Sequence, residues 1–146
     1  MSLADAGWLI SRAGLGGLES ITPLEGGWDN TNLQLMLEDG SSFVLKAWYA
    51  NTVEEVSRVI DCHIHLHDNG IPTTVPIILT DGGYLAIKDG IAWTLLPFVA
   101  GGMLGLDEES LWNLGEIQAR MHLIPVADCF PDSYRMGFDL FDEVVS

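Results

Sequence analysis

Lys46 is the residue of this sequence best placed for chemistry. The chain of 146 residues contains only two lysines, and Lys46 lies in the run Phe43-Val44-Leu45-Lys46-Ala47-Trp48. On a strand, Val44, Lys46 and Trp48 share one face, so the ammonium group projects from an apolar surface. A partly buried ammonium is costly unless it meets an anion. The pattern fits a phosphate-binding lysine, a lysine that reaches from an edge strand into water, or one paired with a local carboxylate.

A glycine-containing turn lies upstream of this lysine. Gly26 and Gly27 open the segment Gly26-Gly27-Trp28-Asp29-Asn30-Thr31-Asn32, which joins two predicted strands. Glycine lets a backbone approach a ligand closely, and successive N–H groups can hold an anion. A hairpin turn with glycine is a common feature by itself. The turn, the lysine on the next strand and a helix after it together favour a phosphate site.

The spacing of apolar and turn residues predicts an α+β fold. Helices are expected over residues 3–15, 52–68 and 106–123, and Thr52 with Glu55 would form a capping box at the start of the second. The expected strands cover residues 18–24, 31–37, 42–49, 75–79, 84–88 and 91–98. Three strands precede the long helix, and two or three follow it. Adjacent strands joined by hairpins would form an antiparallel five-stranded sheet, with the long helix covering one face.

The composition restricts the partners of the chain. Its 21 acidic residues against 6 Lys and Arg give a formal net charge of -15, which excludes nucleic acid and an anionic membrane surface as partners. The longest uncharged run, residues 91–106, is shorter than a membrane-spanning helix and is interrupted by Pro97. Two cysteines, Cys62 and Cys129, are too few for a disulfide framework. No secretion signal is recognised, so a cytoplasmic location is predicted.

A histidine cluster offers a different kind of site. His63 and His67 lie four residues apart in the predicted second helix, a spacing at which two side chains can share a metal ion. No third ligand is evident on that face. Histidines near a helix C-terminus are also favoured by the helix dipole, which needs no metal. A metal-binding domain is therefore a lesser alternative, and no metal ligands are assigned.

Taken in order, these segments resemble the N-terminal part of the aminoglycoside phosphotransferase, choline kinase and type II homoserine kinase family, which has a protein-kinase-like fold. Residues 26–32 match the family's G-G-x-x-N-x-N nucleotide loop, and residues 43–46 match the strand with its phosphate-binding lysine. Residues 65–72 match the end of the first-lobe helix with its G-I-P turn, and Leu96-Pro97-Phe98-Val99 matches the hinge. The resemblance covers roughly residues 21–122, which is most of the chain.

The resemblance implies ATP-dependent phosphoryl transfer to a small hydroxyl-bearing acceptor, such as an amino alcohol, an aminoglycoside or an amino acid. Lys46 would contact the α- and β-phosphates, the glycine loop would cover them, and the hinge backbone would pair with adenine. The expected nucleotide-binding residues are Lys46, Gly26, Gly27, Asn30, Asn32, Glu55, Leu96, Phe98 and Val99. Because the acidic chain would repel ATP at long range, the local cation and Mg²⁺ would be indispensable.

Two departures from the family pattern matter. The helix glutamate that holds the lysine in kinase-like folds would fall near Val59, which is apolar. Glu55, one turn earlier on the same side, would reach the lysine after a small shift, and Asp61 is the other nearby acid. Either the pair is shifted or it is missing. The family's base and metal ligands come from an H-x-D-x-x-x-x-N loop and a later Asp, yet no Asp of this sequence has Asn five positions later. The chain alone is therefore predicted to transfer no phosphate, and no catalytic residues are assigned.

These departures predict the organisation of the chain. Residues 1–98 would form a kinase-like N-terminal lobe, and residues 99–146 the hinge and the start of an incomplete C-terminal lobe, with the Mg²⁺ ligands expected in the missing part. The main alternative is a non-catalytic nucleotide-binding or interaction module. A lobe without its partner exposes apolar surface, which favours homo-oligomers.

Overall fold

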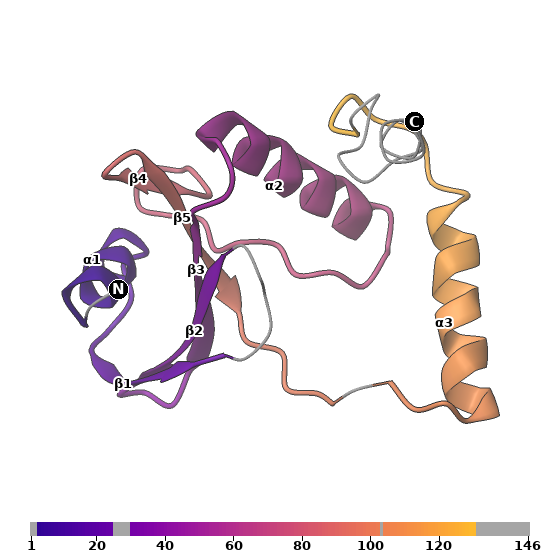
Figure 1. The fold of residues 1–146 in the computed structure, drawn as a ribbon, viewed down its shortest axis with the longest axis horizontal. Helices are drawn as coiled ribbons and strands as arrows, with labels where there is room; N and C mark the ends of the chain where they lie inside the picture. Colours follow the sequence, from indigo (N-terminus) through magenta and orange to yellow (C-terminus); the bar gives the residue numbers. More distant parts are fainter. Residues whose placement is uncertain (1–2, 25–29, 103, 131–146) are drawn as a thin grey trace, which may run out of the picture.

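The computed structural model describes residues 3–24, 30–102 and 104–130 (Figure 1). Its elements, in chain order, are α1 (Leu3–Arg12), β1 (Leu18–Pro23), β2 (Thr31–Leu37), β3 (Ser42–Trp48), α2 (Val53–Asp68), β4 (Ala86–Lys88), β5 (Ile91–Pro97) and α3 (Glu108–Met121). The strands form one sheet in the order β1-β2-β3-β5-β4, and all neighbours are antiparallel. The predicted α+β fold with a five-stranded antiparallel sheet is confirmed.

One face of the sheet is covered by α1, and the larger hydrophobic core lies between them. The strands contribute every second residue to this core, because alternate side chains point to the same face. Its buried residues include Ala6, Leu9 and Ile10 of α1 with Leu33, Leu35, Leu37, Leu45, Ala47, Trp93 and Leu95 of the sheet. The sequence predicted an amphipathic helix here, whereas the face that it covers is known only from the structure.

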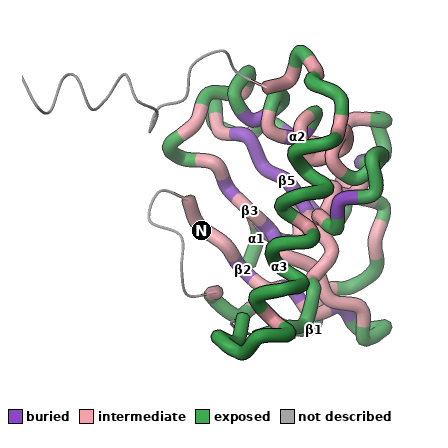
Figure 2. Tube along the Cα trace, turned by 90° about the vertical axis from the view of Figure 1, so that its right-hand side faces the viewer, coloured by how far each residue is buried: buried purple, intermediate pink, exposed green. Residues whose placement is uncertain are grey.

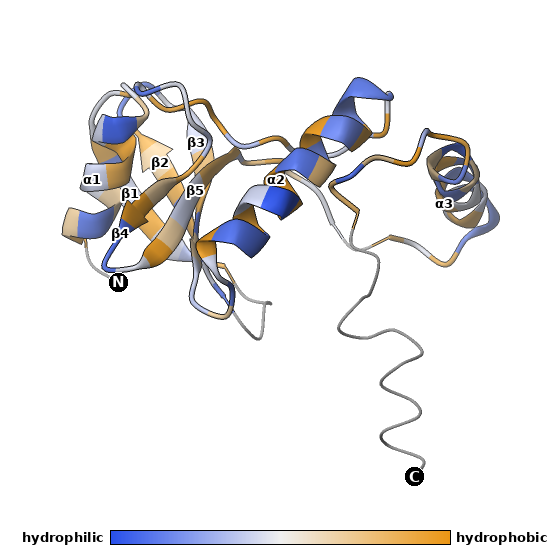
Figure 3. Cartoon of the chain, turned by 90° about the horizontal axis from the view of Figure 1, so that it is seen from above, coloured by the Kyte–Doolittle hydropathy of each residue, from blue (hydrophilic) through white to orange (hydrophobic). Residues whose placement is uncertain are grey.

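The opposite face of the sheet is partly covered by α2 (Figures 1 and 3). Val56 and Ile60 of the helix are buried against Ala92 of β5, and the half-buried Trp48 of β3 packs against this cluster. The sheet therefore lies between two helices, with Lys46 on the α2 side because its position alternates with those of the α1-side core.

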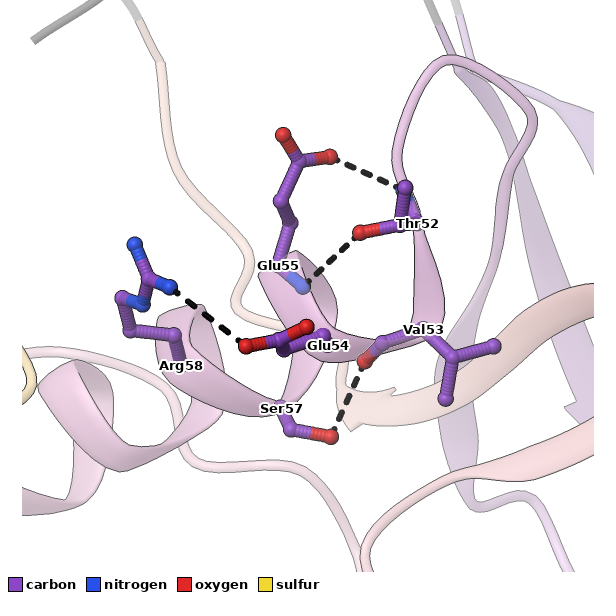
Figure 4. Close-up of polar contacts among 6 residues, drawn as sticks. All are labelled: Thr52, Val53, Glu54, Glu55, Ser57 and Arg58. Carbon is purple, nitrogen blue, oxygen red and sulfur yellow. Dashed lines mark hydrogen bonds and ion pairs between the residues drawn. The ribbon is translucent and has the colours of Figure 1, made fainter.

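The start of α2 confirms the predicted capping box (Figure 4). The backbone N–H of Glu55 donates to Oγ1 of Thr52 at 3.2 Å, and the carboxylate of Glu55 accepts from the backbone N–H of Thr52 at 2.8 Å. Two backbone donors that the first turn of a helix leaves open are thereby satisfied. The helix begins at Val53 and ends at Asp68, as its apolar spacing and the following Asn69-Gly70 predict.

The predicted strand over residues 75–79 is wrong. All of these residues are described and none belongs to a strand; the N–H of Ile77 donates to the carbonyl of Leu95 at 2.7 Å. Its neighbour Pro76 has no N–H and cannot continue a ladder. The predicted strand over 84–88 is also shorter than expected and begins at Ala86.

The two-residue turn between β4 and β5 is as the sequence predicts. Asp89 and Gly90 both have positive φ, at 54° and 76°. Such dihedrals match the twist of a hairpin and favour Asp-Gly at these positions. The turn places the short β4 at the edge of the sheet.

The third helix stands apart from the sheet and is exposed along nearly its whole length (Figures 1 and 2). Within α3, all of which the structure describes, no residue is buried. Near its end, the guanidinium of Arg120 donates to the carbonyl of Gly70, in the turn after α2. In the segment after α3, the carbonyl of Pro125 accepts from an imidazole nitrogen of His65 in α2. In the described ranges, none of the helices has both the length and the apolar character needed to cross a bilayer.

Candidate nucleotide site

Lys46 lies on β3, the central strand of the sheet, on the face that α2 covers in part. In the ladder its neighbours are Asn32 on β2 and Thr94 on β5, so the three side chains form a row across three strands. The next row contains Gln34 of β2, which bonds to Ser42, followed by Val44 and Leu96, which face each other and are both half-buried. Among the described residues, neither belongs to the two hydrophobic clusters, so this part of the face is an apolar platform beside the lysine.

The glycine loop begins and ends close to that row. Gly26 and Gly27 lie outside the described residues. The flanking backbone is described: the N–H of Leu24 donates to the carbonyl of Asn32 at 3.1 Å, which closes the base of the loop beside Lys46. The loop that joins β1 and β2 is therefore anchored at the end of the sheet where the lysine lies.

Asn30 fixes the exit of this loop to the segment between β3 and α2. Its amide nitrogen donates to Oδ1 of Asn51, and its amide oxygen accepts from the N–H of Ala50, both at 3.4 Å. Both ends of the Asn30 side chain are thus occupied by the protein. Asn32, in contrast, is paired with Lys46 on the neighbouring strand, so it is the loop-side asparagine that lies beside the lysine.

The ammonium group of Lys46 contacts an aromatic ring. Its Nζ lies 3.8 Å from the ring centroid of Trp48, two residues along the same strand. Burial lowers the pKa of Lys46 from its usual value. Among the described residues, no ion pair includes Lys46. The carboxylate of Glu55, which the sequence suggests as a partner of the lysine, accepts a hydrogen bond from the N-cap N–H of Thr52.

The predicted hinge comprises the last two residues of β5 and the two that follow it. Leu96 lies opposite Val44, and the N–H of Phe98 extends the ladder by donating to the carbonyl of Ser42 at 3.2 Å. Val99 is 68% exposed. The segment therefore runs from the apolar platform into solvent beside it, and the Phe98 N–H is already taken by β3.

Comparison with known proteins identifies the family. Residues 20–143 match the family described as "Phosphotransferase enzyme family". The chain belongs to this phosphotransferase family. The family suggested by the sequence is confirmed. The first helix, α1, precedes the matched residues.

Curated relatives of this phosphotransferase chain include two homoserine kinases. That of Methylobacillus flagellatus is 29% identical over 110 residues, which are 75% of this chain and 34% of the relative. That of Methylobacillus glycogenes is 31% identical over 112 residues, with the same shares. The chain spans about one third of the length of these relatives.

Two solved structures show that the phosphotransferase fold is kinase-like. A spectinomycin phosphotransferase in complex with ADP and spectinomycin has a TM-score of 0.69 and 18% identity, covering 87% of this chain and 39% of that one. An amicoumacin kinase in complex with AMP-PNP, Ca²⁺ and Ami has a TM-score of 0.61 and 18% identity, covering 96% of this chain and 47% of that one.

The histidine segment of the phosphotransferase chain is engaged in backbone contacts. Nδ1 of His63 lies 2.8 Å from the carbonyl of Thr74, which can only accept, so this nitrogen carries the proton. Nδ1 of His67 lies 3.6 Å from Oδ1 of the adjacent Asp68. In the ranges that the structure describes, no group of three His, Cys, Asp or Glu side chains could hold a metal ion.

The sequence pattern places Trp48 and Val44 on the same face as Lys46 but assigns them no role. Thr94, which is fully buried and lies opposite the lysine, is not evident from the sequence. The alternation along residues 43–48 could have pointed to Val44 and Trp48. Thr94 could not have been found that way, because its position depends on the pairing of β3 with β5.

Proposed function

We propose that this chain binds ATP on the Lys46 face of its sheet and serves as the nucleotide-binding part of a small-molecule phosphotransferase. The observation that carries the proposal is a half-buried lysine, beside the base of a glycine loop, that belongs to no ion pair among the described residues. An anion at this place would compensate the cost of burying the ammonium. Family membership makes a nucleotide phosphate the anion of choice.

The parts of the nucleotide would lie along the two rows. Lys46 would bind the α- and β-phosphates, while Asn32 and the loop of Gly26 and Gly27, fixed by Asn30, would cover them. The apolar platform of Val44 and Leu96 suits the flat face of adenine. Backbone groups of Phe98 and Val99 would border the adenine edge, and Glu55 would fix the start of the neighbouring helix.

Mg²⁺ is expected to arrive with the nucleotide. The described residues offer no cluster of ligands for it, and a net charge of -15 would repel free ATP at long range. Bound Mg²⁺ would neutralise phosphate charge. The remaining contribution of this chain is to place the triphosphate against a fixed cation and to remove water from its adenine.

The acceptor is proposed to be a small hydroxyl-bearing molecule. The relatives and structural neighbours are homoserine, spectinomycin and amicoumacin phosphotransferases. Residues 1–98 would form the nucleotide lobe, and residues 99–146 the hinge and the start of a second lobe, which would contribute the acceptor pocket. Because ATP is the substrate and both described thiols are free, we place this activity in the cytoplasm.

The direct test is thermal unfolding of the 146-residue chain with and without MgATP. Ligand at about 100 times its dissociation constant stabilises a folded protein by about 2.7 kcal/mol, so a clear rise in Tm is expected. A Tm that does not respond to saturating MgATP contradicts the proposal. Phosphoryl transfer to homoserine or an aminoglycoside is expected to be undetectable without an H-x-D-x-x-x-x-N loop, and transfer by this chain would contradict that expectation.

The affinity for ATP is expected to fall at alkaline pH earlier than an ordinary lysine would allow. Burial lowers the pKa of Lys46, so its ammonium loses its proton below the usual value of about 10.4. Titration calorimetry between neutral pH and about pH 10 measures the fall. The Lys46→Arg variant keeps its charge and should lack it. An equal fall in that variant would show that another group titrates.

The same pKa shift does not weaken the fold at high pH. In the window between the lowered pKa and the usual one, the unfolded chain binds more protons at this lysine than the folded chain does. Stability from Lys46 therefore rises with pH across that window. A loss of ATP binding there cannot be ascribed to unfolding caused by this group.

Self-association through α3 is a further expectation. The helix and its flanks expose large apolar side chains, with exposed fractions of 74% for Trp112, 89% for Leu106 and 84% for Leu123. A hollow of about 520 Å³ beside Leu111, Trp112, Gly115 and Glu116 lies on this helix rather than at Lys46. Surface of this kind is normally covered.

Trp112→Glu should therefore shift the chain toward monomer, because a carboxylate cannot be buried in an apolar contact without cost. Sedimentation velocity over a wide range of concentration measures the shift. Ile87→Glu, which places the same charge at an exposed apolar position of the β4 edge, is a control expected to leave association through α3 unchanged. A wild-type chain that is monomeric at every concentration contradicts this prediction.

A further inference from the structure

The contact between Lys46 and Trp48 is close enough to hold the ammonium group. A cation within about 6 Å of an indole centroid is attracted by the negative face of the ring, and indole is the strongest of the aromatic partners. Here the separation is 3.8 Å. Because the residues are two apart on β3, their side chains leave the same face of the strand.

The indole is itself fixed at its polar edge. Nε1 of Trp48 donates to Oγ1 of Thr94 at 3.0 Å. Thr94 is fully buried, and its Cα is paired with that of Lys46 across the β3–β5 ladder. The ring thus reaches diagonally from β3 to the residue opposite the lysine, and the strand pairing sets its position.

The apolar edge of the indole is packed as well. Trp48 contacts the cluster of Val56, Ile60 and Ala92, which joins α2 to the sheet. One side chain therefore links the lysine, β5 and the long helix. A ring held at both edges can restrict the lysine to few rotamers before any ligand arrives.

From these contacts we infer that Trp48, anchored by Thr94, is the positioning residue that holds the Lys46 ammonium toward the nucleotide phosphates. The inference rests on the proposed function. A ring attracts the cation without supplying an acceptor, so all three N–H donors of the ammonium stay available to phosphate oxygens. A carboxylate in its place would occupy some of those donors and reduce the positive charge that ATP meets.

The first test needs no nucleotide. Reductive methylation with ¹³C-formaldehyde labels both lysines and the N-terminal amine. Lys88 lies 5.4 Å from the ring centroid of Trp8, so its signal is identified separately through Lys88→Arg and is not used as an unshifted reference. The methyl protons of Lys46 should be shifted upfield by the ring current of Trp48, with the signal assigned through Lys46→Arg. Trp48→Leu should abolish the shift, Thr94→Val should reduce it, and Trp48→Phe should keep part of it. Removal of an indole elsewhere, in Trp112→Leu, should leave it unchanged.

The second test measures ATP affinity in the unmodified full chain. Trp48→Leu should weaken MgATP binding by about 2- to 30-fold, and Trp48→Phe should recover most of that loss because it restores a ring. In a Lys46→Ala background, Trp48→Leu should have no further effect, since the ring would act only through the lysine. An equal loss in both backgrounds would overturn the inference and leave Trp48 a packing residue.

The two tests separate this inference from the proposed function. If the Lys46 signal of the wild-type chain shows no upfield shift, or Trp48→Leu leaves it in place, the positioning contact is refuted whatever ATP does. If the shift is present and the wild-type chain does not bind MgATP, the proposed function fails, and the role of the contact toward phosphate fails with it.

Discussion

Replacing Lys46 with alanine should weaken MgATP binding by roughly 10- to 100-fold, which corresponds to one lost hydrogen-bonding group with a full charge. The ammonium is the only side-chain cation of the row that crosses β2, β3 and β5, all of whose residues are described. Removing it leaves the phosphates opposite a neutral face in a chain of net charge -15. Titration calorimetry or an ATP-dependent thermal shift measures the change.

The free energy of unfolding of the Lys46→Ala variant is expected to rise or to stay unchanged, although its ATP affinity falls. Burial disfavours the charged form of this lysine, as the direction of its pKa shift indicates, so the free protein gains little from keeping it. A variant with unchanged or higher Tm and lost ATP response would assign the lysine to ligand binding. Lost ATP response together with a large fall in Tm would instead indicate a structural role.

Lys88→Ala is the matched control, because Lys88 is the other lysine of the chain. It lies on β4, where its ammonium pairs with Asp5 of α1. Its loss should affect the attachment of α1 and leave ATP affinity unchanged. If both lysine variants lose ATP affinity alike, the loss reflects the net charge of the chain, and Lys46 does not contact the phosphates.

Local signals in the sequence were sufficient for the elements that flank this lysine. The capping box of Thr52 and Glu55 set the start of α2, and the Asp89-Gly90 pair set the β4–β5 hairpin. Both depend on residues at most three positions apart, where local geometry decides the outcome. The order of these elements, with the lysine strand between loop and helix, was enough to suggest a phosphate site.

Contacts between segments far apart in the chain could not be predicted from the sequence. The bond from Trp48 to Thr94 joins residues 46 positions apart and depends on the register of β3 against β5. Residues 75–79 have the apolar sequence of a strand, yet the structure assigns no strand there. Whether such a segment joins a sheet depends on its pairing with a distant strand. For Glu55, the sequence pattern fixes the capping contact with Thr52, three residues away, because that contact is local.

The packing of α1 against the sheet also could not be predicted from the sequence. Leu9 is fully buried in the core between α1 and the sheet, although the helix precedes the residues that match the family. Leu9→Ala should lower the free energy of unfolding by about 2–5 kcal/mol, because it removes buried methyl groups and leaves a cavity. Urea unfolding measures this as a lower midpoint with an unchanged slope.

Leu3→Ala is the control for this substitution, since Leu3 lies on the same helix with 72% of its surface exposed. Its effect should stay within about 0.5 kcal/mol. If the two variants unfold alike, α1 does not form part of the core. The folded fraction of Leu9→Ala should still bind MgATP with wild-type affinity, because Leu9 and Lys46 lie on opposite faces of the sheet. Loss of affinity there would place the nucleotide on the α1 face and remove Lys46 from the site.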